Sequence, residues 1–120
     1  MFLTALNPDK WAGSPSQVVS GITVAAGNSS QALAVALTGE VNLIGTSSAT
    51  ASTGVRLPAN AAPGDTVLVH NGGAETTLVY PAVGGKVDAL STNAGFSMTT
   101  GKKAVFVAVS PLNWIAVLSA

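Results

Sequence analysis

The stretch that decides the fold runs from Asp65 to Pro81 and reads DTVLVHNGGAETTLVYP. Two runs rich in β-branched residues flank Asn71-Gly72-Gly73, and both central residues of a type I′ turn need positive φ, which this sequence allows. We therefore expect a strand, a tight turn and a second strand that form a hairpin. The stretch also holds the only histidine of the chain, His70, so it bears on whether the protein is an enzyme.

His70 is explained more simply as a strand residue just before a turn than as a catalytic group. A Ser-His-Asp triad needs a nucleophile and an acid that converge on the histidine, and no nucleophile elbow is present. One histidine without cysteine leaves a zinc site short of its usual ligands. The acidic residues all stand in or beside expected turns and strand ends, where solvated acids normally lie: Asp9, Glu40, Asp65, Glu75 and Asp88. We expect no enzyme activity, no catalytic residue, no metal site and no cofactor.

One further segment, GFSMTTGKK at residues 95–103, superficially resembles a phosphate-binding loop. Five residues separate its glycines, and Lys103 stands where Ser or Thr would bind magnesium. The segment also lies between two expected strands without a following helix. We interpret it as a second hairpin.

The composition is unusually poor in charge. Five Lys and Arg balance five Asp and Glu, so only 8% of the 120 residues are charged, against a typical quarter. Only Lys102 and Lys103 are adjacent, which argues against nucleic-acid binding because phosphate recognition needs clustered positive charge. With 48% apolar residues, the chain is expected to bury surface against other copies or a larger assembly, although Ser, Thr, Asn and Gly can also solvate a surface.

Targeting signals are not evident in the sequence. No run of 18 apolar residues is present, so no membrane span is expected. The beginning, MFLTALNPDKW, lacks a basic residue before a short apolar stretch and does not resemble a secretory signal. The chain has no cysteine, which excludes disulfides and is neutral about compartment.

Residues 1–16, MFLTALNPDKWAGSPS, are expected to form an extended N-terminal arm. Their two prolines resist regular structure, yet the segment carries large apolar side chains that a merely disordered tail would usually lack: Phe2, Leu3, Leu6 and Trp11. We interpret these four as partner-binding residues that dock on the chain's own domain or on a neighbour. An ordinary edge segment packed on its own core is the competing interpretation.

Residues 17–120 are expected to form one β-domain. Short runs of alternating or β-branched residues recur every 8 to 12 positions with turn residues between them, which predicts an antiparallel β-sandwich or a jelly-roll-like barrel. The run QALAVAL at residues 31–37 also fits a helix, but its length and flanking glycines favour a strand. In AVFVAVS, residues 104–110, both faces are apolar, so we expect a central strand covered on both sides.

The C-terminal two thirds of the chain, about residues 40–120, resembles a module of tailed-bacteriophage structural proteins. The ordered set consists of a Val-x-Leu-Pro strand, a Gly-Asp turn, a V-x-N-x-G motif, a V-Y-P strand, a Gly-Gly turn, a Gly-Lys connection with F-V, and a late Trp. The matching positions are Val55, Leu57, Pro58, Gly64, Asp65, Val69, Asn71, Gly73, Val79, Tyr80, Pro81, Gly84, Gly85, Gly101, Lys102, Phe106, Val107 and Trp114.

This resemblance implies a function in virion architecture. Such modules occur in head decoration (cement) proteins, head fibres and tail-associated proteins, and they are often trimers. We therefore expect a capsid decoration protein that is assembled in the host cytoplasm, binds the major capsid protein on the outer capsid surface and self-associates, with a trimer as the state that the resemblance implies. The alternative is a receptor- or carbohydrate-binding module of a head or tail fibre, with Tyr80, Trp114 and Asn71 as candidate contacts.

Overall fold

The computed structural model describes residues 17–119. The expected arm, residues 1–16, lies outside the described residues together with Phe2, Leu3, Leu6 and Trp11, so the arm and its binding role stay predictions. The described part contains strands and turns and no helix. The all-β expectation for this part is therefore confirmed.

Ten strands form two sheets. In chain order they are β1 (Val18–Thr23), β2 (Val35–Ala36), β3 (Val41–Thr46), β4 (Gly54–Arg56), β5 (Thr66–Asn71), β6 (Thr77–Tyr80), β7 (Lys86–Val87), β8 (Phe96–Met98), β9 (Lys103–Ala108) and β10 (Asn113–Leu118). One sheet has six strands in the order β1-β3-β5-β9-β10-β7, and the other has four in the order β2-β4-β6-β8. The expected strand at residues 31–37 shrinks to the two residues of β2, after a turn.

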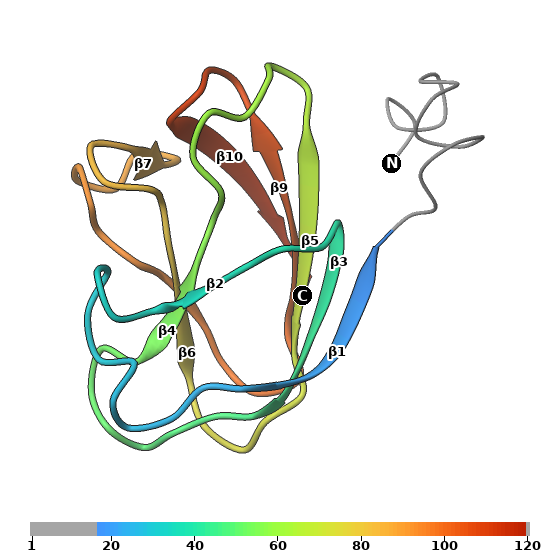
Figure 1. Cartoon of the computed structure of the whole chain (residues 1–120), viewed down its shortest axis with the longest axis vertical. Helices are drawn as coiled ribbons and strands as arrows, with labels where there is room; N and C mark the ends of the chain where they lie inside the picture. Colours follow the sequence, from blue (N-terminus) through green and yellow to red (C-terminus); the bar gives the residue numbers. More distant parts are fainter. Residues whose placement is uncertain (1–16, 120) are drawn as a thin grey trace.

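The chain alternates between the two sheets, and this corrects the expected architecture. From β1 to β6, each long strand of the six-stranded sheet is followed by a short strand of the four-stranded sheet (Figure 1). Successive strands in each sheet are parallel: β1 with β3, β3 with β5, β2 with β4, and β4 with β6. These strands are stacked coils of a β-solenoid. The antiparallel sandwich or jelly-roll-like barrel was therefore the wrong prediction.

The deciding stretch is one coil of this solenoid and not a hairpin. β5 pairs with β3 and β9, while β6 pairs with β4 and β8 in the other sheet. Neither Gly72 nor Gly73 has positive φ, so the expected type I′ turn does not form. A Cβ on Gly73 would lie 2.6 Å from the Ser47 nitrogen, and one on Gly72 would lie 2.8 Å from the Ile44 oxygen. These glycines are needed because consecutive coils approach closely there.

A buried asparagine holds the crossing from β5 to β6. Asn71 is fully buried, and its Nδ2 donates to the carbonyl oxygens of Glu75 (2.8 Å) and Met98 (2.9 Å). Its Oδ1 accepts from the Gly73 N–H at 3.1 Å. Buried backbone groups need such partners, so one side chain satisfies the backbone where the chain leaves one sheet for the other.

The second expected hairpin is also wrong. Gly101 does turn the chain with a φ of 81°, but β8 lies in the four-stranded sheet and β9 in the six-stranded sheet. The hairpin of this region lies one connection later, where β9 and β10 pair antiparallel from Trp114 opposite Ala108 to Leu118 opposite Ala104. β9 is antiparallel to β5, so the stack of parallel strands in this sheet ends at β9, and β10 runs in the direction of the coils again.

The outermost edge of the six-stranded sheet is covered beyond β10. The short strand β7 pairs with Asn113 and Trp114. Asp88 follows directly, donates its N–H to the Trp114 oxygen (2.8 Å), and accepts the Ala116 N–H on its Oδ1 (3.0 Å). The Asp88 carboxylate therefore accepts from the Ala116 N–H, which could otherwise pair with another strand.

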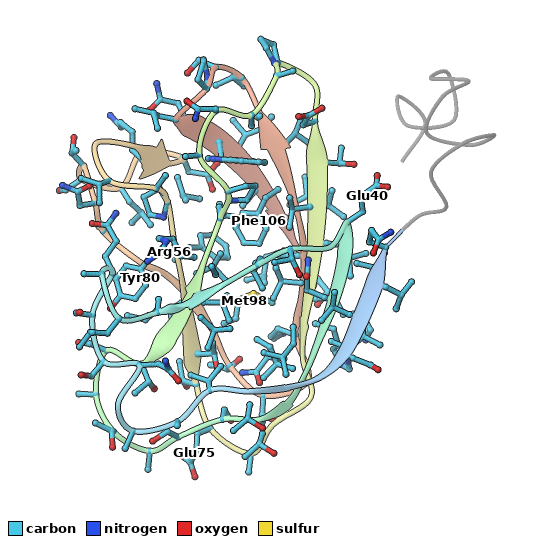
Figure 2. All side chains as sticks on the ribbon, in the orientation of Figure 1. Glu40, Arg56, Glu75, Tyr80, Met98 and Phe106 are labelled. Atoms are coloured by element: carbon cyan, nitrogen blue, oxygen red, sulfur yellow. The ribbon has the colours of Figure 1, made fainter. Side chains whose placement is uncertain are left out.

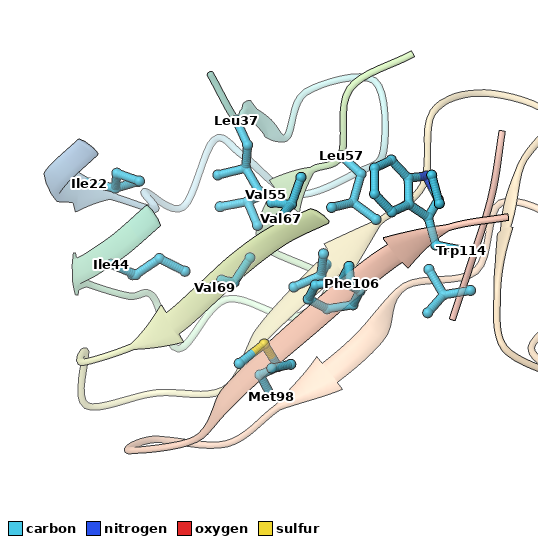
Figure 3. Close-up of a cluster of buried hydrophobic side chains, with 14 of the residues drawn as sticks. Ile22, Leu37, Ile44, Val55, Leu57, Val67, Val69, Met98, Phe106 and Trp114 are labelled. Atoms are coloured by element: carbon cyan, nitrogen blue, oxygen red, sulfur yellow. The ribbon is translucent and has the colours of Figure 1, made fainter. Parts of the chain in front are cut away.

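The core lies between the two sheets. Figure 3 shows it as a cluster to which both sheets contribute, with Trp114 and Phe106 as its largest fully buried members. The Phe96 and Phe106 rings meet edge to face at 5.4 Å between centroids. The inward apolar residues of the long strands, such as Ile44, Val67, Val69 and Phe106, belong to this cluster, so the outward residues of the same strands form the opposite face of the sheet.

Candidate contact face on the six-stranded sheet

The outward face of the six-stranded sheet carries an aligned row of aliphatic side chains. In the strand pairing, Val18 of β1 stands opposite Val41 of β3, Val41 opposite Leu68 of β5, Leu68 opposite Val105 of β9, and Val105 opposite Val117 of β10. We call these five residues the aliphatic row. Directly paired residues in a sheet point to the same side, so the row crosses five strands as one surface.

The aliphatic row is open to solvent in the described part of the molecule. Val18 is 60% exposed and Val117 is 67% exposed at its two ends, and the three members between them are half-buried by their neighbours. Val107 and Ile115, paired in the adjacent position, extend the apolar surface. The prediction that β9 is central is confirmed, but the prediction that both its faces are covered is wrong for the described chain.

Two ionisable groups on this face, His70 and Lys103, lie at one end of the strands, and Lys86 on β7 lies towards the opposite end at the edge of the sheet. His70 on β5 stands between Leu43 on β3 and Lys103 on β9, one outward position beyond the aliphatic row. No carboxylate or hydroxyl nucleophile is paired in register with His70, so the sheet does not assemble a triad around it. His70 is a strand residue at the border of an apolar surface, as the sequence predicted.

The outward face of the four-stranded sheet is built differently. Tyr80 is buried outside the core cluster, and its hydroxyl donates to the Ser52 oxygen at 2.6 Å. Arg56 donates from one guanidinium nitrogen to the oxygens of Gln31 (2.9 Å) and Ala32 (3.2 Å). Gln31 Nε2 in turn donates to the Pro81 oxygen at 2.8 Å. Loops therefore pack on this face and are fastened to it by polar contacts (Figure 2).

The remaining acidic side chains are dispersed. Figure 2 shows Glu40 and Glu75 far apart, at different ends of the molecule. Within residues 17–119, no group of three or more His, Cys, Asp or Glu side chains is placed to hold a metal ion. Asp65 serves its own turn, since its Oδ2 accepts the Ala62 N–H at 2.9 Å.

One hollow of about 380 Å³ lies near the ends of β3 and β5. Glu40, Asn60, Asp65 and Trp114 are among its lining residues. The Trp114 indole N–H has no acceptor among the described residues, but the side chain is only 2% exposed. Trp114 therefore belongs to the core between the sheets and does not offer a ring face to a ligand.

The residues named for carbohydrate binding are all interior. Asn71 is fully buried, Trp114 is in the core cluster, and Tyr80 is 7% exposed under a loop. A sugar-binding platform needs exposed ring faces. The expectation that these three side chains form such a platform is wrong.

Comparison with known proteins adds no relative. No protein-family model matches the chain, and no curated protein matches it. The resemblance to phage modules therefore rests on the quoted motifs alone. In the described part of the chain, no helix is both long and apolar enough to cross a membrane.

The sequence contained a partial signal for the contact face. The doubly apolar pattern of residues 104–110 marks β9 as unusual, but by itself it predicts burial within the chain. No sequence pattern marks the other row members, because their common position depends on pairing between strands distant in the sequence: Val18, Val41, Leu68 and Val117.

Proposed function

We propose that the chain is a structural protein of a bacteriophage virion that decorates the outer capsid surface. In this function it binds the major capsid protein after synthesis in the host cytoplasm and stabilises the shell by bridging its subunits. The protein acts through contact surfaces and not through catalysis, and it needs no cofactor. The motif resemblance over residues 40–120 supports the phage setting.

The observation that carries this proposal is the aliphatic row. Contiguous exposed apolar surface on a small protein marks a site of contact with other macromolecules. Interface centres are depleted in charge, and on this face His70 and Lys103 lie beyond the row. The side-chain hydrogen bonds of Arg56 and Asn71 go to backbone oxygens of the same chain and stabilise its fold.

A contact surface of modest affinity suits a partner that offers many identical binding sites. A shell presents many identical sites, so modest contacts repeated over many copies give lasting occupancy. We propose the N-terminal segment, residues 1–16, as the capsid anchor, through Phe2, Leu3, Leu6 and Trp11. The folded solenoid would then remain on the outside as a cap.

The receptor- or carbohydrate-binding alternative has less support. Its three candidate residues are buried, and no other exposed aromatic cluster is evident in the described chain. Specific glycan-array binding by the purified chain would nevertheless restore it.

The test is co-sedimentation with empty shells of the phage that encodes the chain. Saturable binding in a fixed ratio to the major capsid protein supports the proposal. A variant lacking residues 1–16 is expected to lose binding while its far-UV circular dichroism stays unchanged. Failure of the full chain to bind at any concentration would reject the decoration function, and wild-type occupancy by the shortened variant would reject the anchor.

A further inference from the structure

We propose that the aliphatic row is the interface with a second copy of this chain, and that two copies pair face to face about a two-fold axis. The inference rests on the proposed function only in taking this face as a contact surface. It does not depend on the phage setting. Its test in solution therefore succeeds or fails independently of shell binding.

The order of side chains along the row is self-complementary. From β1 to β10 it reads Val18, Val41, Leu68, Val105, Val117, which is symmetric about the leucine. A two-fold axis parallel to the strands through Leu68 would place Val18 of one copy against Val117 of the other. A two-fold interface requires this reciprocity, because the same patch must fit itself.

The net charge of the chain does not oppose this pairing. The chain has equal numbers of acidic and basic residues, and proteins with net charge near zero associate readily. Under the same axis, Lys103 of one copy would face Leu43 of the other, at the border of the contact. The long lysine side chain can there keep its ammonium group in water while its methylene groups pack.

The size of the face predicts a weak dimer. Five strands spaced about 4.8 Å apart and about six residues long give a footprint of roughly 400 to 500 Å² for each copy. Two copies would together bury about 800 to 1,000 Å², at or below the lower limit for a specific interface. Packed sheets align their strands within about 30°, so the strands of the two copies should run in nearly the same direction. Because the buried area is small, the fraction of dimer should depend on protein concentration.

A two-fold dimer differs from the trimer that the motif resemblance implies. A three-fold ring needs two different complementary surfaces on each copy, whereas a flat face that fits itself closes after two copies. The two expectations therefore give different masses in solution.

The first experiment is light scattering on a sizing column with the full chain at low and high concentration. The mass should rise from 11.8 kDa towards twice that value. Val117→Lys should raise the dissociation constant at least tenfold, and Val83→Lys is the matched control, because Val83 is 71% exposed and lies outside the row. A monomer at every concentration, a trimer, or equal effects of the two variants would each overturn the proposal.

The second experiment uses the absence of native cysteine. Leu68→Cys places a thiol beside the proposed axis, and facing sheets lie about 10 Å apart. A bismaleimide with a spacer of about 10 Å should therefore join two Leu68→Cys chains much more efficiently than two Val83→Cys chains. Equal cross-linking yields would show that copies meet only by random collision, and the proposal would be wrong.

Discussion

The outward faces of the two sheets differ in how far the rest of the chain covers them. The four-stranded sheet is covered by its own loops, which Tyr80, Arg56 and Gln31 fasten through hydrogen bonds. The six-stranded sheet leaves the aliphatic row in the open, with Val18 and Val117 more than half exposed. Both inward faces supply the same core. The difference indicates that one outward face completes the fold while the other is available for contact.

The largest expected effect is on the covered face. Tyr80→Ala removes a buried ring and its hydrogen bond to Ser52, so the free energy of unfolding should fall by about 3 to 5 kcal/mol. Denaturant unfolding at low protein concentration measures this loss. Tyr80→Phe is the control and should lose only about 1 kcal/mol. A loss below about 1 kcal/mol for Tyr80→Ala would mean that the loop does not cover this face in solution.

The next effect concerns the crossing that joins the two faces. Asn71→Ala leaves the buried Met98 oxygen without its side-chain donor and the Glu75 oxygen with the Ser47 hydroxyl as its side-chain donor, and should cost about 2 to 3 kcal/mol. Thermal unfolding followed by circular dichroism measures the change. Ser91→Ala, at an exposed turn, is the control and should stay near wild type. A tolerated Asn71→Ala would contradict the assigned function of this amide.

A smaller effect is expected where the first loop is fastened. Arg56→Met keeps the aliphatic stem of the side chain but removes the donors to Gln31 and Ala32, which should cost about 1 to 2 kcal/mol. The turn at residues 31–34 should then open more often. Amide hydrogen exchange should accelerate at Leu33, whose N–H bonds the Ser30 oxygen, and should stay unchanged at Leu68 in the other sheet. Unchanged exchange at Leu33 would show that the loop is held by other contacts.

The smallest effect is expected on the open face. Val117→Thr preserves shape on an exposed edge, so the unfolding free energy of the monomer should change by no more than about 0.5 kcal/mol. Denaturant unfolding at low concentration isolates the monomer. A loss above about 1 kcal/mol there would indicate that another part of the same chain already covers Val117, and the contrast between the faces would disappear.

Much of the local structure follows from the sequence. Alternation and β-branched residues located β3, β5, β9 and β10, and the turns at Gly64, Gly84 and Gly101 do have positive φ. These features depend on neighbours in the chain, where strand propensity and backbone sterics act directly. The pairing of strands does not depend on such neighbours, and it was there that the expectation was wrong.

The misinterpretation of Asn71-Gly72-Gly73 has a definite physical cause. Glycine permits positive φ, and it also permits close backbone approach, so its presence before a second strand does not distinguish a hairpin from a stacked coil. The wider pattern was more informative: a long strand and a short strand alternate three times before β7. Regular recurrence over 20 to 50 residues is typical of solenoids.

The contact face could be anticipated only in part for a related reason. Outward Val105 and Val107 were visible as a second apolar face of one strand. Their alignment with Val18 and Val41 required the parallel register of β1, β3 and β5, which no local signal supplies.

The carboxylate of Asp88 beside β10 bears on whether the chain polymerises at high concentration. A concentrated β-rich chain with little charge is a candidate for runaway polymerisation, in which each added molecule templates the next. Growth of that kind needs edge strands with free backbone hydrogen-bonding groups on both sides of the sheet. Asp88 and β7 close one of the two edges of the six-stranded sheet, so copies cannot extend this sheet end to end without limit.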